Sequence, residues 1–337
     1  MKKLKVAIIG CGVVGKRRKS FILKNKNYQL VAVSDICFKR DLFRKGEINY
    51  YKKYLDLLKT ESLDAVFITL PNYLASKVTI DCIKKRIHVF CEKPPAKNLI
   101  ELKKVFKIHK KHPRIKLKYG FNHRYHSSIQ LAKKIIKTRK FGKLQNFRCL
   151  YGKSKIVTYE KGEWRSKKRF AGGGILLDQG IHVLDLLRFF NGDFNEFKGF
   201  ISNRYWKYDI EDNAFALMRD KKGIVASIHS SATQWQHKFR MEITLEKALI
   251  ELNGILSGSK SYGKESLNLI AKKKSSKGSK IIKKFFFNKD NSWKNEIEEF
   301  SNIIQKNKKV ITGNIKDAIK VMAMVEKIYS SDRNWKK

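Results

Sequence analysis

A run of apolar residues near the start of the chain leads directly into three regularly spaced glycines. The run covers residues 4–9, and the motif Gly10-Cys-Gly12-Val-Val-Gly15 follows it and opens a helix-like stretch. In such a unit the first glycine permits a tight turn, the second lets a pyrophosphate approach the backbone, and the third allows the helix to pack closely on the strand. The amides at the start of the helix then face the phosphates. The motif therefore predicts a dinucleotide-binding domain.

The first third of the chain alternates between apolar strand-like stretches and helix-like stretches. This alternation is typical of a doubly wound parallel sheet, a Rossmann fold in an α/β protein. The expected strands are residues 4–9, 30–34, 65–70, 87–91 and 115–121, and the expected helices are residues 14–25, 74–85 and 99–109.

The pattern changes near residue 122, where strand-like stretches begin to follow one another. Consecutive strands indicate a second α/β domain with an open, mostly antiparallel sheet. We therefore expect a dinucleotide-binding domain at residues 1–122 and a second domain at residues 123–337, to which the family resemblance described below assigns substrate binding and oligomerisation. The expected strands of the second domain are residues 144–150, 197–202, 213–219, 224–230, 239–245, 248–252, 267–271 and 281–287, with a turn or loop at 272–280. The expected helices are residues 128–138, 172–190, 293–306 and 315–329.

An acidic residue ends the second expected strand. Asp35 lies 20 residues after Gly15, where a carboxylate binds the ribose 2′-hydroxyl of NAD and repels the 2′-phosphate of NADP. We therefore expect NAD. Because Lys39 and Arg40 follow closely, NADP stays the less favoured alternative.

Three of the chain's four prolines, Pro71, Pro94 and Pro95, follow expected strands of the first domain. Ligands of a doubly wound sheet bind outside the carboxyl ends of its strands. Residues 70–72 and Lys93 are therefore expected to line the cofactor cleft. A lysine there is suited to stabilise negative charge on a reacting oxygen. The alternative for Lys93 is a plain surface lysine at a strand end.

The expected helix at 172–190 is apolar around almost its whole circumference, which indicates burial. Asp178, His182 and Asp185 nevertheless occupy positions i, i+4 and i+7, and therefore one face. Burying ionisable groups without partners costs several kcal/mol. Proton transfer is one explanation of the stripe, and a structural histidine held by its neighbours is the other.

The formal net charge is +45, from 75 basic and 30 acidic side chains. The lysines are spread along the whole chain and no nucleic-acid-binding motif accompanies them, which favours a solvated basic surface over a specific nucleic-acid partner. No apolar run is long enough for a membrane helix, so no membrane insertion is expected. The five cysteines lack the CxxC spacing of zinc sites. They indicate reduced thiols, a cytoplasmic protein and no metal.

Taken together, the motifs resemble the glucose–fructose oxidoreductase / inositol dehydrogenase / rhizopine-catabolism family, Gfo/Idh/MocA. The resemblance covers nearly the whole chain. It rests on GCGVVG at Gly10, TLPNYL at Thr69, CEKPPA at Cys91, GFNHRYH at Gly120, EWR at Glu163 and GGGILLDQGIHVLDLL at Gly172. Two departures are small: Lys85-Arg86-Ile87 replaces the family's glycine-containing turn, and Pro95 adds a second proline after the lysine motif.

The resemblance implies NAD(P)-dependent oxidation or reduction of sugars, sugar derivatives or cyclitols. It assigns three catalytic residues: His182 as general base, Asp178 to orient the substrate and tune the histidine, and Lys93 to steady the oxyanion and contact the nicotinamide ribose. Asp185 is expected to be structural. The expected cofactor-binding residues are Gly10, Gly12, Val13, Val14, Gly15, Asp35, Leu70, Pro71, Asn72, Glu92 and Lys93. The expected substrate-binding residues are Asn122, Arg124, Trp164, Arg165, Asp178 and His182.

The sequence thus indicates a cytoplasmic NAD-dependent oxidoreductase that acts on a sugar or sugar derivative. A nucleotide-sugar of surface-polysaccharide synthesis is one candidate substrate. Because the family's second-domain sheet often forms subunit contacts, the resemblance implies a homodimer or homotetramer. One alternative is an enzyme of the same fold that recycles a tightly bound NAD(H) internally, or a cofactor-assisted hydrolase or dehydratase. A non-catalytic NAD- or sugar-binding regulator is another.

Overall fold

A computed structural model describes residues 2–155, 164–272 and 279–335. Its contacts divide the chain into two compact units, the first comprising residues 1–121 and 293–319, the second residues 122–292 and 320–337. The sequence-based boundary had assigned residues 293–319 to the second domain. They belong to the first unit because helix α8 (Ser292–Gln305) buries Ile297 and Phe300 in the apolar core of the N-terminal sheet.

The first unit contains a seven-stranded sheet in the order β3-β4-β2-β1-β5-β6-β7. Its strands are parallel except for β3, which pairs antiparallel with β4. The predicted parallel, doubly wound sheet is confirmed. The strands are β1 (Leu4–Ile9), β2 (Tyr28–Ser34), β3 (Leu42–Lys45), β4 (Ile48–Tyr51), β5 (Ala65–Ile68), β6 (His88–Glu92) and β7 (Leu117–Gly120).

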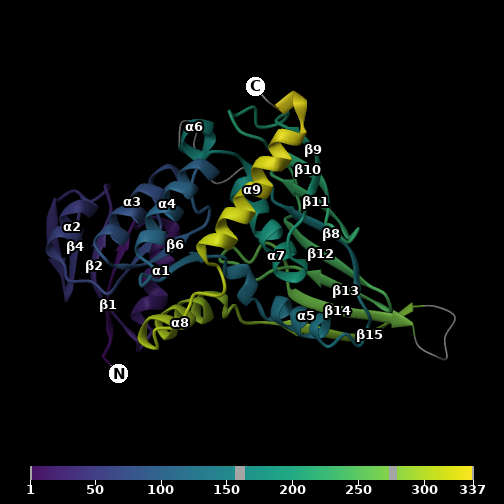
Figure 1. Cartoon of the computed structure of the whole chain (residues 1–337), viewed down its shortest axis with the longest axis horizontal. Coiled ribbons are helices and arrows are strands. Elements are labelled where there is room, and N and C mark those ends of the chain that lie inside the picture. The colour runs from purple at the N-terminus through teal and green to yellow at the C-terminus, as the bar shows by residue number, and fades with distance from the viewer. Residues whose placement is uncertain (1, 156–163, 273–278, 336–337) are drawn as a thin grey trace. The chain divides into compact units, whose positions relative to one another are not determined.

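Three helices of this unit correspond to predicted ones: α1 (Val13–Leu23), α3 (Asn72–Lys84) and α4 (Leu99–Lys111). A fourth helix, α2 (Tyr54–Thr60), was not predicted. Helices α3 and α4 run side by side (Figure 1). The core is aromatic near the sheet centre, where Phe67 and Phe90 each meet the ring of Phe300 edge-on, at 5.9 and 5.5 Å between ring centroids. Such contacts add to the stabilisation from burial alone.

The strand order reverses at β1. The chain runs outward from β1 to β2 and β4, and then returns to the other side of β1 to form β5, β6 and β7. Ligands of such sheets bind where the order reverses, outside the carboxyl ends of the strands. The turn after β1 contains Gly10 and Gly12, and the turn after β5 contains Pro71, so both predicted motifs lie at this point.

The second unit contains an eight-stranded sheet in the order β15-β14-β13-β12-β8-β11-β10-β9. Every pairing is antiparallel except that of β8 with β11, which confirms the predicted mostly antiparallel sheet. The strands are β8 (Leu144–Gly152), β9 (Glu196–Ser202), β10 (Asn213–Arg219), β11 (Val225–Ser231), β12 (Lys238–Leu245), β13 (Ala248–Asn253), β14 (Glu265–Lys272) and β15 (Ser279–Phe287). Most of the loop predicted at 272–280 lies outside the described residues.

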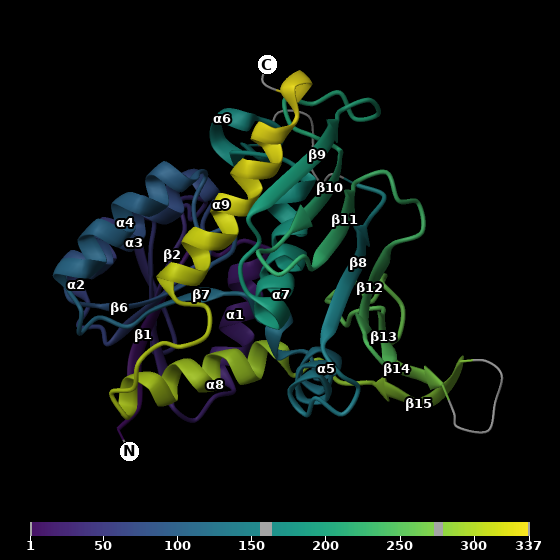
Figure 2. The same cartoon turned by 45° about the vertical axis from the view of Figure 1, so that its right-hand side comes forward.

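Two helices, α5 (Ser127–Lys137) and α7 (Ile181–Asn191), lie on one face of this sheet (Figures 1 and 2). Helix α9 (Ile315–Ser331) contributes residues to both units and is followed by a short 3-10 helix, η4 (Arg333–Trp335). None of the described helices combines the length and apolar character that a bilayer crossing requires.

The single helix predicted at 172–190 is broken up in the structure. Residues 172–174 form an irregular segment after a short helix α6 (Lys168–Ala171), and a π-helical turn, η3 (Leu176–Gly180), precedes α7. A π turn is wider than an α turn and occurs often at functional sites. Here it carries Asp178, whereas His182 and Asp185 are in the regular helix.

Candidate active site

The glycine motif forms a cradle at the start of α1. Gly10 has φ +95°, and its N–H donates to the Ser34 carbonyl at 2.8 Å. A Cβ on Gly15 would lie 2.1 Å from the Gly10 oxygen, so only glycine fits there. The Cβ position of Gly12, in contrast, has no described atom within 4 Å. That open side and the helix amides fit a pyrophosphate.

Asp35 is hydrogen-bonded to this cradle through one carboxylate oxygen and to its own turn through the other. The Cys11 N–H donates to its Oδ2 at 2.5 Å, and the Cys37 N–H donates to its Oδ1 at 2.9 Å. These bonds hold the acidic group beside the glycine turn, which fits the predicted contact with a ribose hydroxyl. Lys39 and Arg40 are exposed.

The turn after β5 lies against the same cradle. The Thr69 hydroxyl donates to the Gly10 carbonyl at 2.5 Å, and a Cβ on Gly10 would meet Leu70 Cδ2 at 3.2 Å. Pro71 is the N-cap of α3, and Asn72 is its first residue and is buried. The structure therefore places the predicted residues Leu70, Pro71 and Asn72 next to the glycine motif. Val13 at the helix start is 88% exposed, and Val14 is partly buried.

Glu92 has a charged partner that the sequence did not reveal. The Arg18 Nε donates to Glu92 Oε1 at 2.6 Å, and Arg18 Nη2 donates to Glu296 Oε2 at 2.5 Å. Arg18 and Glu296 are completely buried. These contacts point to a structural task for Glu92, and its assignment to the cofactor stays a prediction. The following residue, Lys93, is partly buried and joined to Pro94 by a cis peptide bond.

In the second unit, Asp178 and His182 have different environments. The Asp178 carboxylate accepts from Lys153 Nζ at 3.1 Å, and its side chain is 33% exposed. His182 is only 5% exposed, and its imidazole stacks on that of His123, with 3.6 Å between ring centroids and 16° between ring planes. The π turn before His182 therefore leaves the acid reachable from solvent and the imidazole enclosed.

Asp185 forms a buried ion pair with Arg124. The guanidinium donates through Nε to Oδ2 at 2.7 Å and through Nη2 to Oδ1 at 2.6 Å. Bidentate pairs of this kind are among the stronger ionic contacts in proteins. The structural role expected for Asp185 agrees with this pair. Arg124 is held by it and by the nearby ring of Phe189, so these contacts anchor α7, and a substrate role for Arg124 stays a prediction.

The remaining predicted substrate residues are Trp164 and Arg165, in the short 3-10 helix η2 (Trp164–Ser166), and Asn122, the first residue of the second unit. The Arg165 guanidinium lies 4.4 Å from the centre of the Trp164 ring, and both side chains are partly buried. Glu163, which belongs to the same motif, lies outside the described residues. Asn122 is buried and hydrogen-bonded to His123 and Ser292, so its role as a substrate ligand also stays a prediction.

Sequence reasoning missed two residues next to the predicted catalytic pair. Lys153 directly follows the end of β8, a position that a strand prediction ending at residue 150 left in a loop. His123 lies within the GFNHRYH motif, between Asn122 and Arg124, the two residues of that motif that were predicted to bind substrate. Its position between them was the one signal in the sequence that could have marked it as a site residue.

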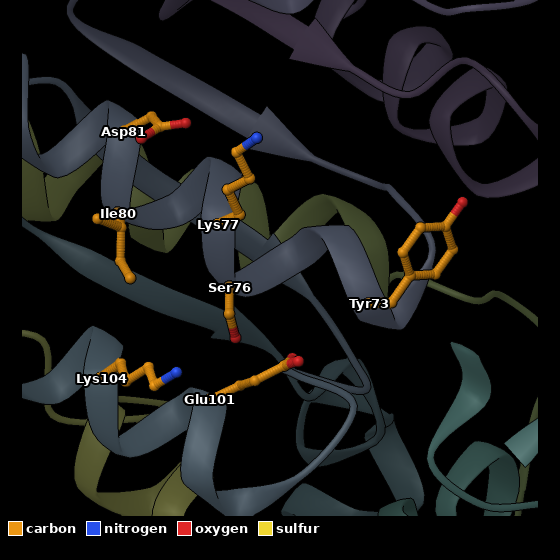
Figure 3. Close-up of a pocket in the computed structure, with 7 residues that line it drawn as sticks. All are labelled: Tyr73, Ser76, Lys77, Ile80, Asp81, Glu101 and Lys104. Carbon is orange, nitrogen blue, oxygen red and sulfur yellow. The ribbon is translucent and has the colours of Figure 1, made fainter. Parts of the chain in front are cut away.

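A pocket of about 250 Å³ lies between α3 and α4 in the first unit (Figure 3). Ser76 and Glu101 point toward one another across it. Its lining contains none of the predicted catalytic or cofactor residues, and it is formed by Tyr73, Ser76, Lys77, Ile80, Asp81, Glu101 and Lys104. Among the described side chains, no group of three or more His, Cys, Asp or Glu residues is arranged to hold a metal ion.

Both units match families of known proteins. Residues 4–121 match an oxidoreductase family described as an NAD-binding Rossmann fold, and residues 129–251 match the GFO/IDH/MocA C-terminal domain. The chain is 26% identical over 236 residues to the myo-inositol 2-dehydrogenase of Thermotoga maritima, which is 68% of each protein. It is 28% identical over 196 residues to the glucose-6-phosphate 3-dehydrogenase of Bacillus subtilis, 56% of this chain and 55% of that enzyme.

A solved structure has the same fold over nearly the full length. The WlbA dehydrogenase from Bordetella pertussis, in complex with NADH and UDP-GlcNAcA, superposes with a TM-score of 0.79 at 19% identity. The match covers 99% of this chain and 97% of that one. The whole described architecture, and not the dinucleotide-binding unit alone, is therefore shared.

Proposed function

Because the chain belongs to the Gfo/Idh/MocA family of NAD-binding oxidoreductases, we propose that it transfers a hydride between NAD and a hydroxyl or keto carbon of a sugar or sugar derivative. One observation carries the chemistry: the enclosed imidazole of His182 follows the solvent-reachable carboxylate of Asp178 by four residues. Histidine is the most frequent general base in enzymes, and it must come within hydrogen-bonding reach of the proton that it accepts, which a neighbouring carboxylate that orients the substrate can ensure.

The chain's own residues then have separate tasks. His182 accepts the proton of the substrate hydroxyl at an imidazole nitrogen as the carbon is oxidised. Asp178 accepts a hydrogen bond from a neighbouring hydroxyl and so orients the sugar, and Lys153 fixes the position of that carboxylate. Lys93 donates to the reacting oxygen and stabilises the negative charge that develops there.

Asp35 supports NAD over NADP as the cofactor. Its Oδ2 accepts from the Cys11 N–H in the glycine cradle, and its Oδ1 accepts from the N–H of Cys37; a carboxylate fixed there repels a 2′-phosphate. Gly10, Gly12 and Gly15 would hold the pyrophosphate, with Leu70 to Asn72 beside them. When bound, the nicotinamide supplies the hydride acceptor or donor.

The proposed substrate class follows from the relatives. The sequence relatives named above act on myo-inositol and on glucose 6-phosphate, both of which carry a ring of secondary hydroxyls. The structural neighbour holds a nucleotide-linked sugar, which supports a nucleotide-sugar as the finer candidate.

We also propose that the protein is a cytoplasmic homodimer or homotetramer. Strands β9 and β10 carry Phe200, Phe215 and Leu217, whose exposed fractions are 77, 48 and 56%. Exposed apolar patches on a sheet commonly mark protein–protein contacts. Light scattering should give a mass of two or four chains, and Phe200→Glu should reduce it. A monomer at micromolar concentration would contradict the assembly.

The central test follows NADH formation by absorbance with a panel of cyclitols, free sugars, sugar phosphates and nucleotide-sugars. Net NADH formation would also exclude internal recycling of a bound cofactor. Asp178→Asn and His182→Ala should bind NAD with unchanged affinity, measured by calorimetry, and Lys93→Ala, which loses a predicted contact to the nicotinamide ribose, should still bind NAD. Turnover should fall about 10²–10⁴-fold for His182→Ala, the usual range for a general base. Near-normal turnover of His182→Ala would contradict the proposed role of His182 as general base.

A further inference from the structure

The ring of His182 lies flat against the ring of a second histidine. His123 comes from the short helix η1 (Asn122–Tyr125), and the two imidazoles are almost parallel at 3.6 Å between centroids. Both residues are more than nine-tenths buried. Two positive charges at this separation repel strongly where water is excluded. The protonation state of His123 therefore bears directly on that of His182.

A chain of hydrogen bonds fixes which nitrogen of His123 carries its proton. The Ser292 hydroxyl donates to Asp290 Oδ1 at 2.6 Å, so the Ser292 oxygen accepts from Asn122 Nδ2 at 3.2 Å. The amide oxygen of Asn122 is then the atom that faces His123 Nδ1 at 3.2 Å. Because an amide oxygen only accepts, His123 Nδ1 must carry the hydrogen.

The other ring nitrogen of His123 faces a hydroxyl. Tyr151 Oη lies 3.0 Å from His123 Nε2. Burial raises the pKa of Tyr151 well above its ordinary value, so the hydroxyl keeps its proton and donates it to Nε2. With a donor on one nitrogen and an acceptor on the other, His123 is matched as a neutral imidazole.

We propose that His123 is a positioning residue for His182: a neutral imidazole, locked in one tautomer, whose face receives the positive charge formed when His182 accepts a proton. Its catalytic meaning rests on the proposed role of His182 as general base. A cation over an aromatic face is stabilised, and more so when water is excluded. The stack also fixes the plane of the His182 ring, and therefore the direction in which its nitrogens point.

The charged groups packed around this stack have hydrogen-bond partners of their own. Asp178 pairs with Lys153 and Asp185 pairs with Arg124, so the fields of these two ion pairs partly cancel at the rings. Glu265 Oε2 lies 2.8 Å from His126 Nδ1, and Asp290 accepts from the Ser292 hydroxyl. Tyr262 contributes a hydroxyl that accepts from Gln179, and Phe239 an apolar ring near His123. A neutral His123 therefore adds no second positive charge to the stack when His182 accepts a proton.

The test is a pH titration of the full-length protein labelled with ¹³C-histidine, followed by NMR. The His182 signal is assigned by its loss in His182→Gln. In the unmodified protein, His123 should show no protonation step between about pH 5 and 9, because the imidazole that would otherwise titrate near 6.5 is held neutral. A His123 step in that range would overturn the proposal without any substitution.

Two substitutions separate the ring from mere bulk. His123→Leu should lower the titration midpoint of His182 by about one pH unit, because the aromatic face is lost. His123→Phe keeps a neutral ring and should lower it by less than half of that. Equal shifts in the two variants, or no shift in His123→Leu, would contradict the proposal. His229→Phe is the matched control, since His229 also stacks on a ring, that of Phe215 at 3.8 Å, and should leave His182 unchanged.

Tyr151→Phe provides a second approach if His123→Leu unfolds. Without the hydroxyl, His123 Nε2 loses its donor and becomes able to take a proton, so His123 should begin to titrate and His182 should become harder to protonate. With any substrate found in the panel, His123→Leu should lower kcat about tenfold with little change of KM. If no substrate is turned over, the proposed function fails, while the NMR titrations still decide the role of His123.

Discussion

Each unit contains a completely buried glutamate, Glu296 in the first unit and Glu211 in the second. The hydrogen-bond donors that compensate the two carboxylates differ in kind. In the first unit, Glu296 and Glu92 share the guanidinium of Arg18. In the second unit, Glu211 accepts from the N–H groups of Gly174 and Leu176 at 2.7 and 2.9 Å and from the Tyr329 hydroxyl at 2.8 Å. These three donors to Glu211 are all neutral groups.

The difference shows two ways of keeping a carboxylate away from water. A cation compensates it with a strong but fragile interaction, because removing that cation leaves the buried charge uncompensated. Neutral donors share the task, so losing one leaves the others in place. Both arrangements act on the site: Glu92 directly precedes Lys93, and Glu211 holds the segment that leads into Asp178.

The largest expected effect is the loss of the shared cation. Arg18→Met keeps an unbranched apolar stem but removes the guanidinium, which leaves Glu92 and Glu296 buried without their cation, and should reduce the free energy of unfolding by about 3–5 kcal/mol. Calorimetry measures the change. Adding Glu92→Gln and Glu296→Gln should restore a large part of it, and a triple variant no more stable than Arg18→Met would show that charge is not the cause.

The second expected effect is a pH dependence of the free energy of unfolding, caused by Glu296 in the first unit. Burial, helped by the neighbouring Glu92 carboxylate, outweighs the opposing effect of Arg18 and raises the pKa of Glu296 from 4.5 to about 7. The folded state therefore holds this proton more tightly than the unfolded chain. Its stabilising contribution is full below about pH 4.5 and is lost as the pH rises through 7.

Glu296→Gln cannot titrate, so it isolates this contribution. Between pH 5 and 8 the wild-type protein should lose about 2–3 kcal/mol of unfolding free energy relative to the variant. Denaturant titrations at matched pH values check this. If the difference in unfolding free energy between the two proteins stayed constant from pH 5 to 8, Glu296 would not ionise within that pH range, contrary to the prediction.

Much of the fold could be predicted because apolar periodicity is a local property. The strands β1, β10 and β13 were expected within one residue of their observed bounds. The hairpin β3–β4 was missed because β3 is short and mostly exposed, so it lacks the apolar alternation that marks a strand. The π turn at η3 was missed because apolar periodicity does not distinguish one π turn from an α turn, and because Glu211, which accepts from the N–H groups of Gly174 and Leu176 where the turn begins, is distant in sequence.

The site could be predicted only as far as its motifs reach. The motifs placed Asp35 beside the glycines, and the structure brings them together through the Cys11 N–H. The partners of Glu92 and Asp185 are 74 and 61 residues away in sequence. Nothing local marks Arg18 or Arg124 as buried in a chain so rich in basic residues. Their pairing depends on packing, which a single sequence does not display.

The third expected effect concerns Glu211 and its neutral donors, and it is tested by substituting the two glycines that pack against them. A Cβ on Gly174 would lie 2.1 Å from the backbone oxygen of Glu211, whereas a Cβ on Gly173 would lie 2.2 Å from the Tyr329 hydroxyl. Backbone yields less easily than the end of a side chain. Gly174→Ala should therefore cost about 2–3 kcal/mol of unfolding free energy, and Gly173→Ala about 1 kcal/mol. Equal costs would show that the Glu211 backbone moves freely.

The smallest expected effect comes from removing one neutral donor of Glu211. Tyr329→Phe deletes the hydroxyl but leaves the ring and the two backbone donors, so the carboxylate stays bonded. The cost should be about 1 kcal/mol, the usual contribution of one hydrogen bond, and turnover should change little because Gly174 and Leu176 still anchor the segment before Asp178. Thermal unfolding and the NADH assay measure the two quantities. A loss as large as that of Arg18→Met would end the contrast between the units, since it would mean that Glu211 also depends on a single partner.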